Sequence, residues 1–270
     1  MTSGELDKGV LLSLAGKAAL ITGGSRGIGA ATVRLFVEAG AQVVFNYRSA
    51  KKEAEQLAAE CGGPQHCVAL HRELKTPAHG RELVEEAVRT FGRLDCLVAN
   101  HGIWPPHDAP IESMTDTQWH QTMHVNLDSV FGIAQAAVAQ MKKQTRPADR
   151  SAAGYIVLIS STAGQRGEAM HADYAASKGA IISFTKSLSS ELIRDGIYVN
   201  CVAPGWVDTD MSAATLRDPE KFARVVANIP AGRAATAKEI AGPVLFLCTP
   251  LAGFISGEIF NVNGGAVLVG

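Results

Sequence analysis

The stretch ALITGGSRGIG, residues 19–29, decides the fold of this chain. An apolar, strand-like run passes directly into Gly23, Gly27 and Gly29 and then into a segment with helical periodicity. Glycine permits a tight turn and a close approach of the backbone to a ligand, and the N-terminus of the next helix offers free N–H groups and a positive dipole end. The sequence therefore predicts a turn that holds the pyrophosphate of a dinucleotide.

The spacing of these glycines, TGxxxGxG, differs from the GxGxxG pattern of many dinucleotide-binding turns. Taken alone, the glycines could simply join a strand to a helix without any ligand. Their place after the first strand of an alternating strand–helix pattern favours the ligand-binding interpretation.

Short apolar runs alternate with helix-like segments along nearly the whole chain, roughly every 25 to 30 residues. This alternation predicts parallel strands joined by crossover helices, and near-continuous apolar runs such as IVLIS predict strands that are covered on both faces. We therefore expect an α/β protein, a three-layer α/β/α sandwich around a seven-stranded parallel sheet. The expected strands span residues 18–22, 42–47, 67–70, 96–100, 155–160, 198–202 and 259–262.

Two of the segments between strands carry apolar residues at helical spacing, which predicts amphipathic helices. Their predicted buried faces consist of Ile28, Ala31, Leu35, Phe36 and Ala39 in one helix and Leu83, Val84, Ala87, Val88 and Phe91 in the other. The polar segment 142–154 reads as an exposed connection. The longer interruption at 208–230 is expected to be a mobile substrate loop, because long loops in compact domains are usually functional.

Composition excludes several classes of protein. The 270 residues are 47% hydrophobic and 19% charged, which is too apolar for a disordered chain and too mixed for a membrane protein. Twenty-five basic against 26 acidic residues leave a net charge of −1, which gives no reason to expect nucleic-acid or membrane partners. The five cysteines form no CxxC pair, so neither a disulfide framework nor a metal site is predicted.

The N-terminus carries Glu5, Asp7 and Lys8 and lacks the positively charged start of a secretory signal. No apolar run approaches the roughly 18 residues of a membrane-spanning helix. We expect a cytoplasmic protein, with residues 1–13 as an N-terminal extension of a single domain over 14–270.

Tyr47, Arg48 and Ser49 follow the second strand, where a carboxylate would bind a ribose 2′-hydroxyl and an arginine would bind a 2′-phosphate. No Asp or Glu stands there, and Arg26 can approach from the glycine turn. Two guanidinium groups suit a phosphate dianion, which favours NADP(H) and leaves NAD(H) possible. The alternative is that Arg48 and the lysines after it are solvated charges at a helix start.

The sequence YAASK, residues 174–178, places Tyr174 and Lys178 four residues apart, on one face of a helix. A positive charge near a phenol favours the ionised form, so Lys178 is predicted to lower the pKa of Tyr174 from about 10 towards neutrality. Ser161 stands at the end of the fifth strand, where its hydroxyl can reach a carbonyl beside Tyr174.

With these segments in order, the chain resembles the short-chain dehydrogenase/reductases over about residues 14–265. The resemblance is carried by TGGSRGIG (22–29), VANHG (98–102), HVNL (124–127), ISS ending at Ser161, YAASK (174–178), APGWVDTDM (203–211) and VNGG (262–265). It implies a Rossmann-type fold and a homotetramer or dimer, with contacts through the helices near 118–141 and 174–194 and the last strand.

The resemblance also implies residue roles. Tyr174 would be the general acid/base, Ser161 would orient the carbonyl, and Lys178 would tune Tyr174 and bind the nicotinamide ribose. Asn126 would hold a water that connects Lys178 to solvent. The cofactor-binding set comprises Gly23, Ser25, Arg26, Gly27, Ile28, Gly29, Tyr47, Arg48, Ser49, Glu73, Leu74, Asn100, Gly102, Tyr174, Lys178, Pro204, Gly205, Val207 and Thr209.

Three motifs depart from the usual family pattern. Ala99 and His101 replace an asparagine and an alanine, and His101 either packs or titrates near neutral pH. Glu73 aligns with an aspartate that faces the adenine, and the usual VDGG reads VNGG here.

Within the family the chain looks most like 3-oxoacyl-[acyl-carrier-protein] reductases and related ketone or sugar reductases. Three segments are expected to surround the substrate, namely 103–114, 165–173 and 208–230. Trp104, Met170, His171, Trp206 and Met211 would give the pocket an apolar, aromatic lining, which suits an acyl chain or hydrophobic ketone better than a sugar. The alternatives are an enzyme for sugars, steroid-like or other alcohols with NAD(H), and a dinucleotide-binding sensor without turnover.

Overall fold

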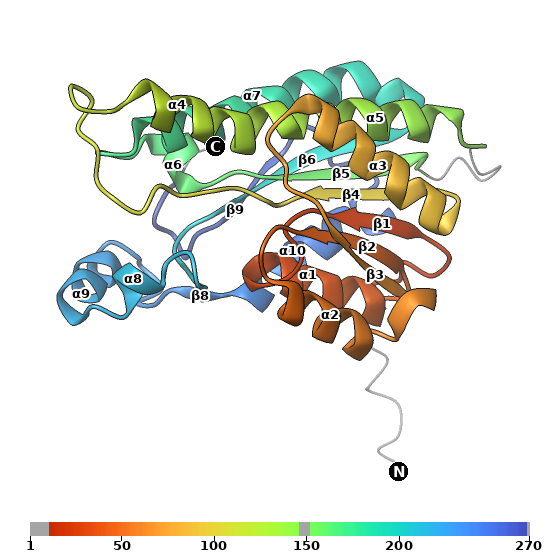
Figure 1. Ribbon diagram of the computed structural model, residues 1–270, viewed down its shortest axis with the longest axis horizontal. Coiled ribbons are helices and arrows are strands. Elements are labelled where there is room, and N and C mark those ends of the chain that lie inside the picture. Colours follow the sequence, from red (N-terminus) through yellow and green to blue (C-terminus); the bar gives the residue numbers. More distant parts are fainter. Residues whose placement is uncertain (1–10, 146–151, 269–270) are drawn as a thin grey trace, which may run out of the picture.

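The computed structural model describes residues 11–145 and 152–268 (Figure 1). Within them, seven strands form one sheet in the order β3-β2-β1-β4-β5-β6-β9, and every neighbouring pair is parallel. The strands are β1 (Ala18–Ile21), β2 (Gln42–Tyr47), β3 (Cys67–His71), β4 (Cys96–Ala99), β5 (Gly154–Ile159), β6 (Ile197–Pro204) and β9 (Ile259–Val262). All seven predicted strands are confirmed, with ends that differ by at most two residues.

The order of the strands creates the ligand crevice. The chain runs from β1 outward through β2 to β3 and then returns to pair β4 with the other side of β1. At such a reversal the connections leave β1 and β4 in opposite directions, so a crevice opens at their carboxyl ends. The predicted glycine turn and Asn100 follow β1 and β4 and therefore meet at this crevice.

Helices cover both faces of the sheet, which confirms the three-layer sandwich (Figure 1). One face carries α1 (Gly27–Glu38), α2 (Lys51–Glu60) and α10 (Ala237–Leu247). The other face carries α3 (Pro77–Phe91), α5 (Ser129–Lys143) and α7 (Ala172–Leu192). No helix of residues 11–145 and 152–268 has the length and hydropathy needed to cross a lipid bilayer.

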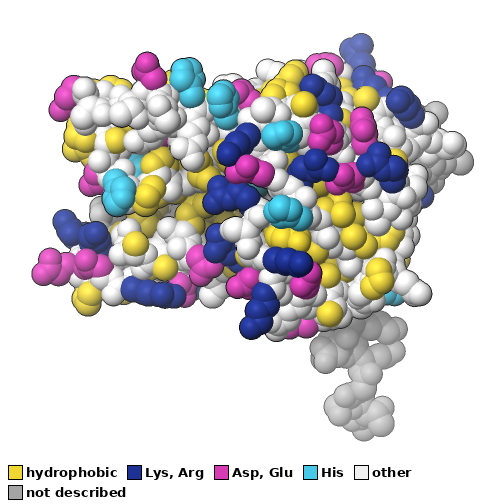
Figure 2. Space-filling view, in the orientation of Figure 1, with side chains coloured by type: hydrophobic (Ala, Val, Ile, Leu, Met, Phe, Trp, Pro, Cys, Tyr) yellow, Lys and Arg dark blue, Asp and Glu magenta, His cyan; other side chains and the backbone are white. Residues whose placement is uncertain are grey.

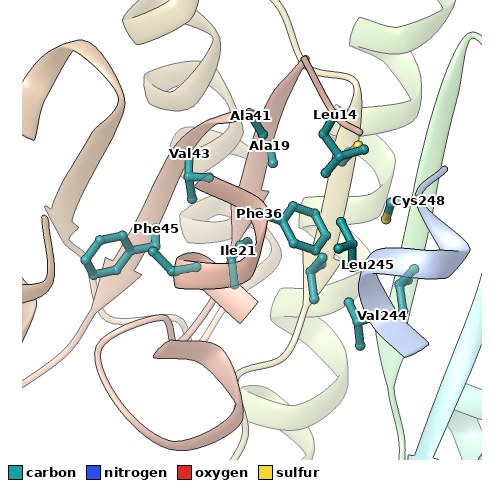
Figure 3. Close-up of a cluster of buried hydrophobic side chains, with 14 of the residues drawn as sticks. Leu14, Ala19, Ile21, Phe36, Ala41, Val43, Phe45, Val244, Leu245 and Cys248 are labelled. Atoms are coloured by element: carbon teal, nitrogen blue, oxygen red, sulfur yellow. The ribbon is translucent and has the colours of Figure 1, made fainter. Parts of the chain in front are cut away.

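The two cores divide the side chains of each strand. In β1, Ile21 packs on the α1 and α10 side, whereas Leu20 packs on the other side. Figure 3 shows Phe36 of α1 between Ile21 and Leu245 of α10. A fully buried side chain of this size contributes roughly 1.5–3 kcal/mol through removal of apolar surface from water.

The predicted face of α1 is largely confirmed, since Phe36 is buried and Ile28, Leu35 and Ala39 are partly buried against the core. Ala31 does not belong to that core, whereas the residues Gly29, Thr32 and Val33, which were not predicted, are buried. The reason lies in the turn before the helix, because a Cβ on Gly29 would stand 2.1 Å from the carbonyl oxygen of Gly23. This close contact places Gly29 on the buried face of α1. In α3 the prediction is confirmed, since Leu83, Val84 and Ala87 are buried and Val88 and Phe91 are partly buried.

Several elements lie outside the sequence prediction. Two short parallel strands, β7 (Val207–Asp208) and β8 (Ala235–Thr236), form a second sheet. The predicted loop 208–230 contains two helices, α8 (Ala213–Leu216) and α9 (Pro219–Ala227), and its mobility stays a prediction. Beside the crevice lie α4 (Asp116–Met123), a π-turn (His124–Asp128) and α6 (Thr162–Arg166). Residues 1–10 of the predicted N-terminal extension and 146–151 of the predicted connection lie outside the described residues.

Candidate active site

The glycine turn has the backbone conformation that its sequence predicts. Gly23 and Gly27 have φ angles of 64° and 55°, the left-handed region that favours glycine. A Cβ on Gly24 would lie 2.5 Å from the Cβ of Phe45, so a larger residue would displace β2. No side chain caps the N-terminus of α1, which leaves its first N–H groups available to an anion.

The ends of β1 and β4 are joined by Asn100. Its Nδ2 donates to the carbonyl oxygen of Thr22 at 3.0 Å, and its backbone N–H donates to the hydroxyl of Thr22 at 2.9 Å. On the other side, Asn46 of β2 accepts the N–H of Gly23 at 2.9 Å. These bonds hold the turn between three strands and keep its glycines open towards the crevice.

Tyr174 and Lys178 project from the first turns of α7, as the four-residue spacing predicts. The Nζ atom of Lys178 lies 5.8 Å from the centre of the Tyr174 ring and donates to the carbonyl oxygen of Ile159 at 2.8 Å. Ser161 follows β5 and caps α6, since its Oγ accepts the N–H of Ala163 at 3.1 Å. The Ser161 hydroxyl also interacts with the phenol of Tyr174, and this interaction lowers the pKa of the phenol. The structure therefore brings together the three predicted groups.

The predicted electrostatics of Tyr174 are wrong in this structure. Burial raises the pKa of its phenol to about 12, and the interaction with the Ser161 hydroxyl opposes this shift without cancelling it. Burial likewise lowers the pKa of Lys178 to about 8, because the ammonium loses its hydration. The reason for the difference is that Lys178 points to Ile159 and its charge contributes less at Tyr174 than desolvation does.

Asn126 occupies the π-turn between α4 and α5 and is 1% exposed. Its Oδ1 accepts the N–H of Ile103 at 2.8 Å, and its Nδ2 donates to the carbonyl of Ile103 at 3.0 Å and to the hydroxyl of Ser177 at 3.1 Å. A Cβ on Gly102 would contact both Asn126 Oδ1 and Lys178 Nζ, at 3.2 and 3.4 Å. Asn126 is therefore next to Lys178, behind Gly102.

One cavity of about 650 Å³ connects the glycine turn with Ser161 and Tyr174. Figure 2 shows the hollow in this face of the molecule, with apolar side chains inside it and Lys and Arg side chains beside it. Of the predicted site residues, those that line the cavity are Gly23, Ser25, Arg26, Gly27, Ile28, Tyr47, Arg48, Ser49, Glu73, Leu74, Asn100, Gly102, Ser161, Tyr174, Lys178, Pro204, Gly205, Val207 and Thr209. Gly29 and Asn126 lie behind this lining.

The residues present fit a dinucleotide. The uncapped start of α1 and the glycines of the turn suit a pyrophosphate, and the hydroxyl and ammonium groups stand at the far end of the same cavity. Arg26 and Arg48 flank the end near β2, and Arg26 is paired with Asp210 at 3.4 Å. No group of His, Cys, Asp or Glu residues within 11–145 and 152–268 has the arrangement of a metal site.

Aromatic rings form the wall of the cavity beside Tyr174. The ring of Trp104 lies 4.6 Å from that of Tyr174, edge to face, and 6.5 Å from that of Trp206. Trp104, Trp206 and Met211 line the cavity as predicted, whereas Met170 and His171 do not. His171 is 5% exposed because it stacks on Trp104 and hydrogen-bonds to the carbonyl of Pro105, and Met170 is half-exposed on the outside of its loop.

The comparison with known proteins agrees with this geometry. A family model described as "Enoyl-(Acyl carrier protein) reductase" matches residues 23–267. The 3-oxoacyl-[acyl-carrier-protein] reductase FabG of Salmonella typhimurium (strain LT2) is 39% identical over 262 residues, which cover 96% of this chain and all of the relative. The chain belongs to the short-chain dehydrogenase/reductase family.

Solved structures of the family have the same fold. The "Short-chain dehydrogenase/reductase SDR:Glucose/ribitol dehydrogenase" of Brucella melitensis is 31% identical, with a TM-score of 0.85 and coverage of 94% of this chain and 98% of that one. A blue fluorescent protein from a metagenomic library, solved in complex with NADPH, is 35% identical with a TM-score of 0.85, over 95% of this chain and all of that one. The present chain is thus an NAD(P)-dependent oxidoreductase that acts on carbonyl or alcohol groups.

Sequence reasoning missed one polar residue of the site, Asn46, and left the state of another, His101, open. Asn46 appears in the sequence as part of an apolar strand, and only the pairing of β2 with β1 shows that its amide supports Gly23. For His101 the sequence predicts either packing or titration near neutral pH. Burial lowers the pKa of His101 to about 3, so its imidazole stays neutral near pH 7, and both ring nitrogens are hydrogen-bonded. The signal for His101 was its departure from the family pattern.

Proposed function

We propose that this enzyme reduces the 3-oxo group of an acyl thioester on acyl carrier protein, or a closely related ketone, with NADPH. The observation that carries the proposal is that Ser161, Tyr174 and Lys178 line the same cavity as the glycine turn, with Lys178 Nζ 5.8 Å from the centre of the Tyr174 ring. The full-length likeness to the Salmonella typhimurium reductase supports the choice of substrate.

Tyr174 acts as the general acid in this proposal. Because burial holds the pKa of its phenol at about 12, Tyr174 carries its proton at neutral pH and can donate it to a carbonyl oxygen that becomes an alkoxide. Ser161 gives the same oxygen a second hydrogen bond and so orients the carbonyl. When bound, the dinucleotide supplies the hydride that reduces the carbonyl carbon.

Lys178 and Asn126 return a proton to Tyr174. The pKa of Lys178, near 8, lets its ammonium release a proton at little cost near neutral pH, which suits a relay. Asn126 is held by the backbone of Ile103 and by Ser177, so it can fix a water beside Lys178 without rearrangement. Lys178 also stands where it can bind the ribose hydroxyls of the nicotinamide.

The cofactor preference for NADPH rests on the end of β2. Tyr47, Arg48 and Ser49 line the cavity there together with Arg26 of the glycine turn, and no carboxylate follows β2 at the position that would take a 2′-hydroxyl. Two guanidinium groups recognise a 2′-phosphate through charge-assisted hydrogen bonds. NAD(H) remains the alternative cofactor.

The wall of the cavity beside Tyr174 favours an acyl chain or hydrophobic ketone over a polyol. Trp104, Pro106, Trp206 and Met211 supply apolar surface around the predicted position of the substrate, and a hydroxylated sugar would leave its hydroxyl groups without partners there. A sugar or other alcohol with NAD(H) is the second candidate, supported by the name of the Brucella melitensis relative.

A substrate panel tests this proposal. Purified enzyme is expected to reduce acetoacetyl-CoA with NADPH, and to do so more slowly with NADH. The variant Tyr174→Phe is expected to bind NADPH with unchanged affinity and to lose turnover. Turnover of polyols with NAD⁺ in the absence of thioester reduction would favour the second candidate. NADPH binding by the wild type without turnover of any ketone would favour a sensor.

We further propose a cytoplasmic homotetramer, with a dimer as the alternative. Phe131 on α5 is 45% exposed, and Phe254 near β9 is fully exposed, so both surfaces predicted to form contacts present an unpaired aromatic ring to solvent. Light scattering of the purified protein should give the mass of four chains, and Phe254→Ser should reduce it to that of two.

A further inference from the structure

His101 connects the glycine turn to the π-turn that carries Asn126. Its Nδ1 lies 2.7 Å from the hydroxyl of Thr22, the last residue before the glycine turn, and its Nε2 lies 2.7 Å from the hydroxyl of Ser129 at the start of α5. The backbone of His101 also lies against the turn, since a Cβ on Gly23 would stand 3.1 Å from its Cα. One side chain thus touches two elements of the site.

The hydrogen bonds around the ring determine its tautomer. Ser129 Oγ donates its proton to the carbonyl oxygen of Val125 at 2.8 Å, so it accepts from Nε2–H of His101. Nδ1 is then the acceptor and receives the hydroxyl proton of Thr22, whose other candidate acceptor, Val98 O, is at 3.5 Å. The bonds form a chain in one direction, from Thr22 through His101 and Ser129 to Val125.

This series of hydrogen bonds ends in the π-turn at residues 124–128. In the π-turn, the N–H of Ser129 bonds to His124 O, five residues back, rather than to Val125 O, four residues back. The Ser129 hydroxyl bonds to Val125 O instead. The π-turn widens the helix where Asn126 points to Ile103 and Ser177. A bond from His101 to Ser129 therefore helps to hold the backbone that presents Asn126.

We propose that His101 is a positioning residue of this active site: through Ser129 it fixes the π-turn that presents Asn126, and through Thr22 it fixes the cofactor turn. The inference rests on the proposed role of Asn126 in proton return. In this proposal the bond from Nε2 to Ser129 supports the catalytic step, and the bond from Thr22 to Nδ1 supports cofactor binding. An alanine at this position could make neither bond.

Two substitutions separate the two bonds. In His101→Asn the side-chain amide oxygen can stand near the place of Nδ1 and keep the bond to Thr22, but the side chain is too short to reach Ser129. In His101→Gln the amide nitrogen can stand near the place of Nε2 and keep the bond to Ser129, with no acceptor left for Thr22. Ser129→Ala removes the bond to His101 from the other side and also removes the bond from Ser129 Oγ to Val125 O.

Hydrogen exchange gives a readout that needs no substrate. His101→Asn and Ser129→Ala should speed amide exchange in the peptide that spans the π-turn, residues 120–132, and His101→Gln should speed it in the peptide that spans the glycine turn, residues 19–29. Equal exchange of both peptides in all three variants and the wild type would overturn the proposal.

Kinetics with NADPH and acetoacetyl-CoA supply the second readout. His101→Asn should lower kcat about tenfold, the effect of losing one buried hydrogen bond, and Ser129→Ala should lower it at least as much because it also loses the bond to Val125 O. Both variants should leave the dissociation constant for NADPH unchanged. His101→Gln should retain most of kcat and bind NADPH several-fold more weakly. The double variant His101→Asn/Ser129→Ala should be no slower than Ser129→Ala alone, since Ser129→Ala already lacks the bond to His101.

The outcomes distinguish this proposal from the proposed function. If the wild type fails to reduce acetoacetyl-CoA, the substrate assignment fails, and exchange together with NADPH binding still tests His101. If the Asn and Gln variants change kcat and NADPH affinity in the same way, or lose only thermal stability, His101 serves packing alone and the division between its two nitrogens is wrong.

Discussion

Replacing Lys178 by methionine should make the enzyme more stable near neutral pH, while abolishing its turnover. The Lys178 side chain is 4% exposed, and no carboxylate is paired with its ammonium in the hydrogen bonds and ion pairs of the described residues. Burial lowers the pKa of Lys178 from 10.5 to about 8. At about 1.4 kcal/mol for each pKa unit, the charged form costs the native state about 3 kcal/mol.

The sign of the pH dependence follows from proton binding. Between pH 8 and 10.5 the unfolded chain keeps a proton on this lysine and the native state does not. The contribution of Lys178 to the free energy of unfolding of the wild type therefore increases as the pH rises. Below pH 8 both states are protonated and the native state bears the full cost. Lys178→Met lacks this contribution at every pH.

Urea unfolding at several pH values between 7 and 10 measures the effect. The free energy of unfolding of Lys178→Met minus that of the wild type should fall by about 2–3 kcal/mol over this range. Burial raises the pKa of Tyr174 and of the thiols of Cys67 and Cys201, which makes both proteins less stable in alkali, and these contributions cancel in the difference. Protein concentration is kept constant because assembly would also affect stability.

The exposed Lys186 on the same helix provides the matched control. Lys186→Met removes an equal charge from α7, and its difference from the wild type should be independent of pH over the same range. If the difference for Lys178→Met is also flat, the ammonium is solvated or paired in the native state, and the reasoning from burial is refuted.

Three further predictions follow from the geometry of the turn and cavity. Gly29→Ala should unfold the protein or lower its free energy of unfolding in urea by more than about 3 kcal/mol, because the new Cβ would stand 2.1 Å from Gly23 O. Gly242→Ala, in open space on α10, is the control and should change the free energy of unfolding by less than about 1 kcal/mol. Equal effects of the two substitutions would contradict the assigned contacts. Trp104→Ala should raise kcat/KM for bulky aryl ketones relative to acetoacetyl-CoA about tenfold, since it opens the wall beside the reacting carbonyl, and an unchanged ratio would show that another wall limits size. Tyr47→Asp should lower kcat/KM for NADPH at least about tenfold relative to NADH, because the carboxylate repels a 2′-phosphate and accepts a hydrogen bond from a 2′-hydroxyl. An unchanged preference would show that the 2′-position of the cofactor ribose does not bind near residue 47.

The sequence alone determined the architecture of this protein because its signals are local. Each strand is a short, mainly apolar run with a turn residue beside it, and a parallel sheet buried on both faces favours that pattern. The glycines at 23, 27 and 29 and the Tyr174–Lys178 spacing likewise carry their meaning within one turn of backbone. The strands could therefore be predicted from these patterns to within two residues at each end, whereas most of the predicted cavity lining rested on the resemblance to the family.

Only the tertiary structure decided how the groups of the site act on one another, since those effects depend on burial and on partners far apart in the chain. Spacing predicts that Lys178 acidifies Tyr174, yet desolvation is the larger effect once helices enclose both groups. The same dependence on enclosure turns His101 from a titrating candidate into a neutral link between residues 79 and 28 positions away. Residue order determines which groups come near the crevice, and three-dimensional packing determines their charge, their hydrogen bonds and the direction in which each one points.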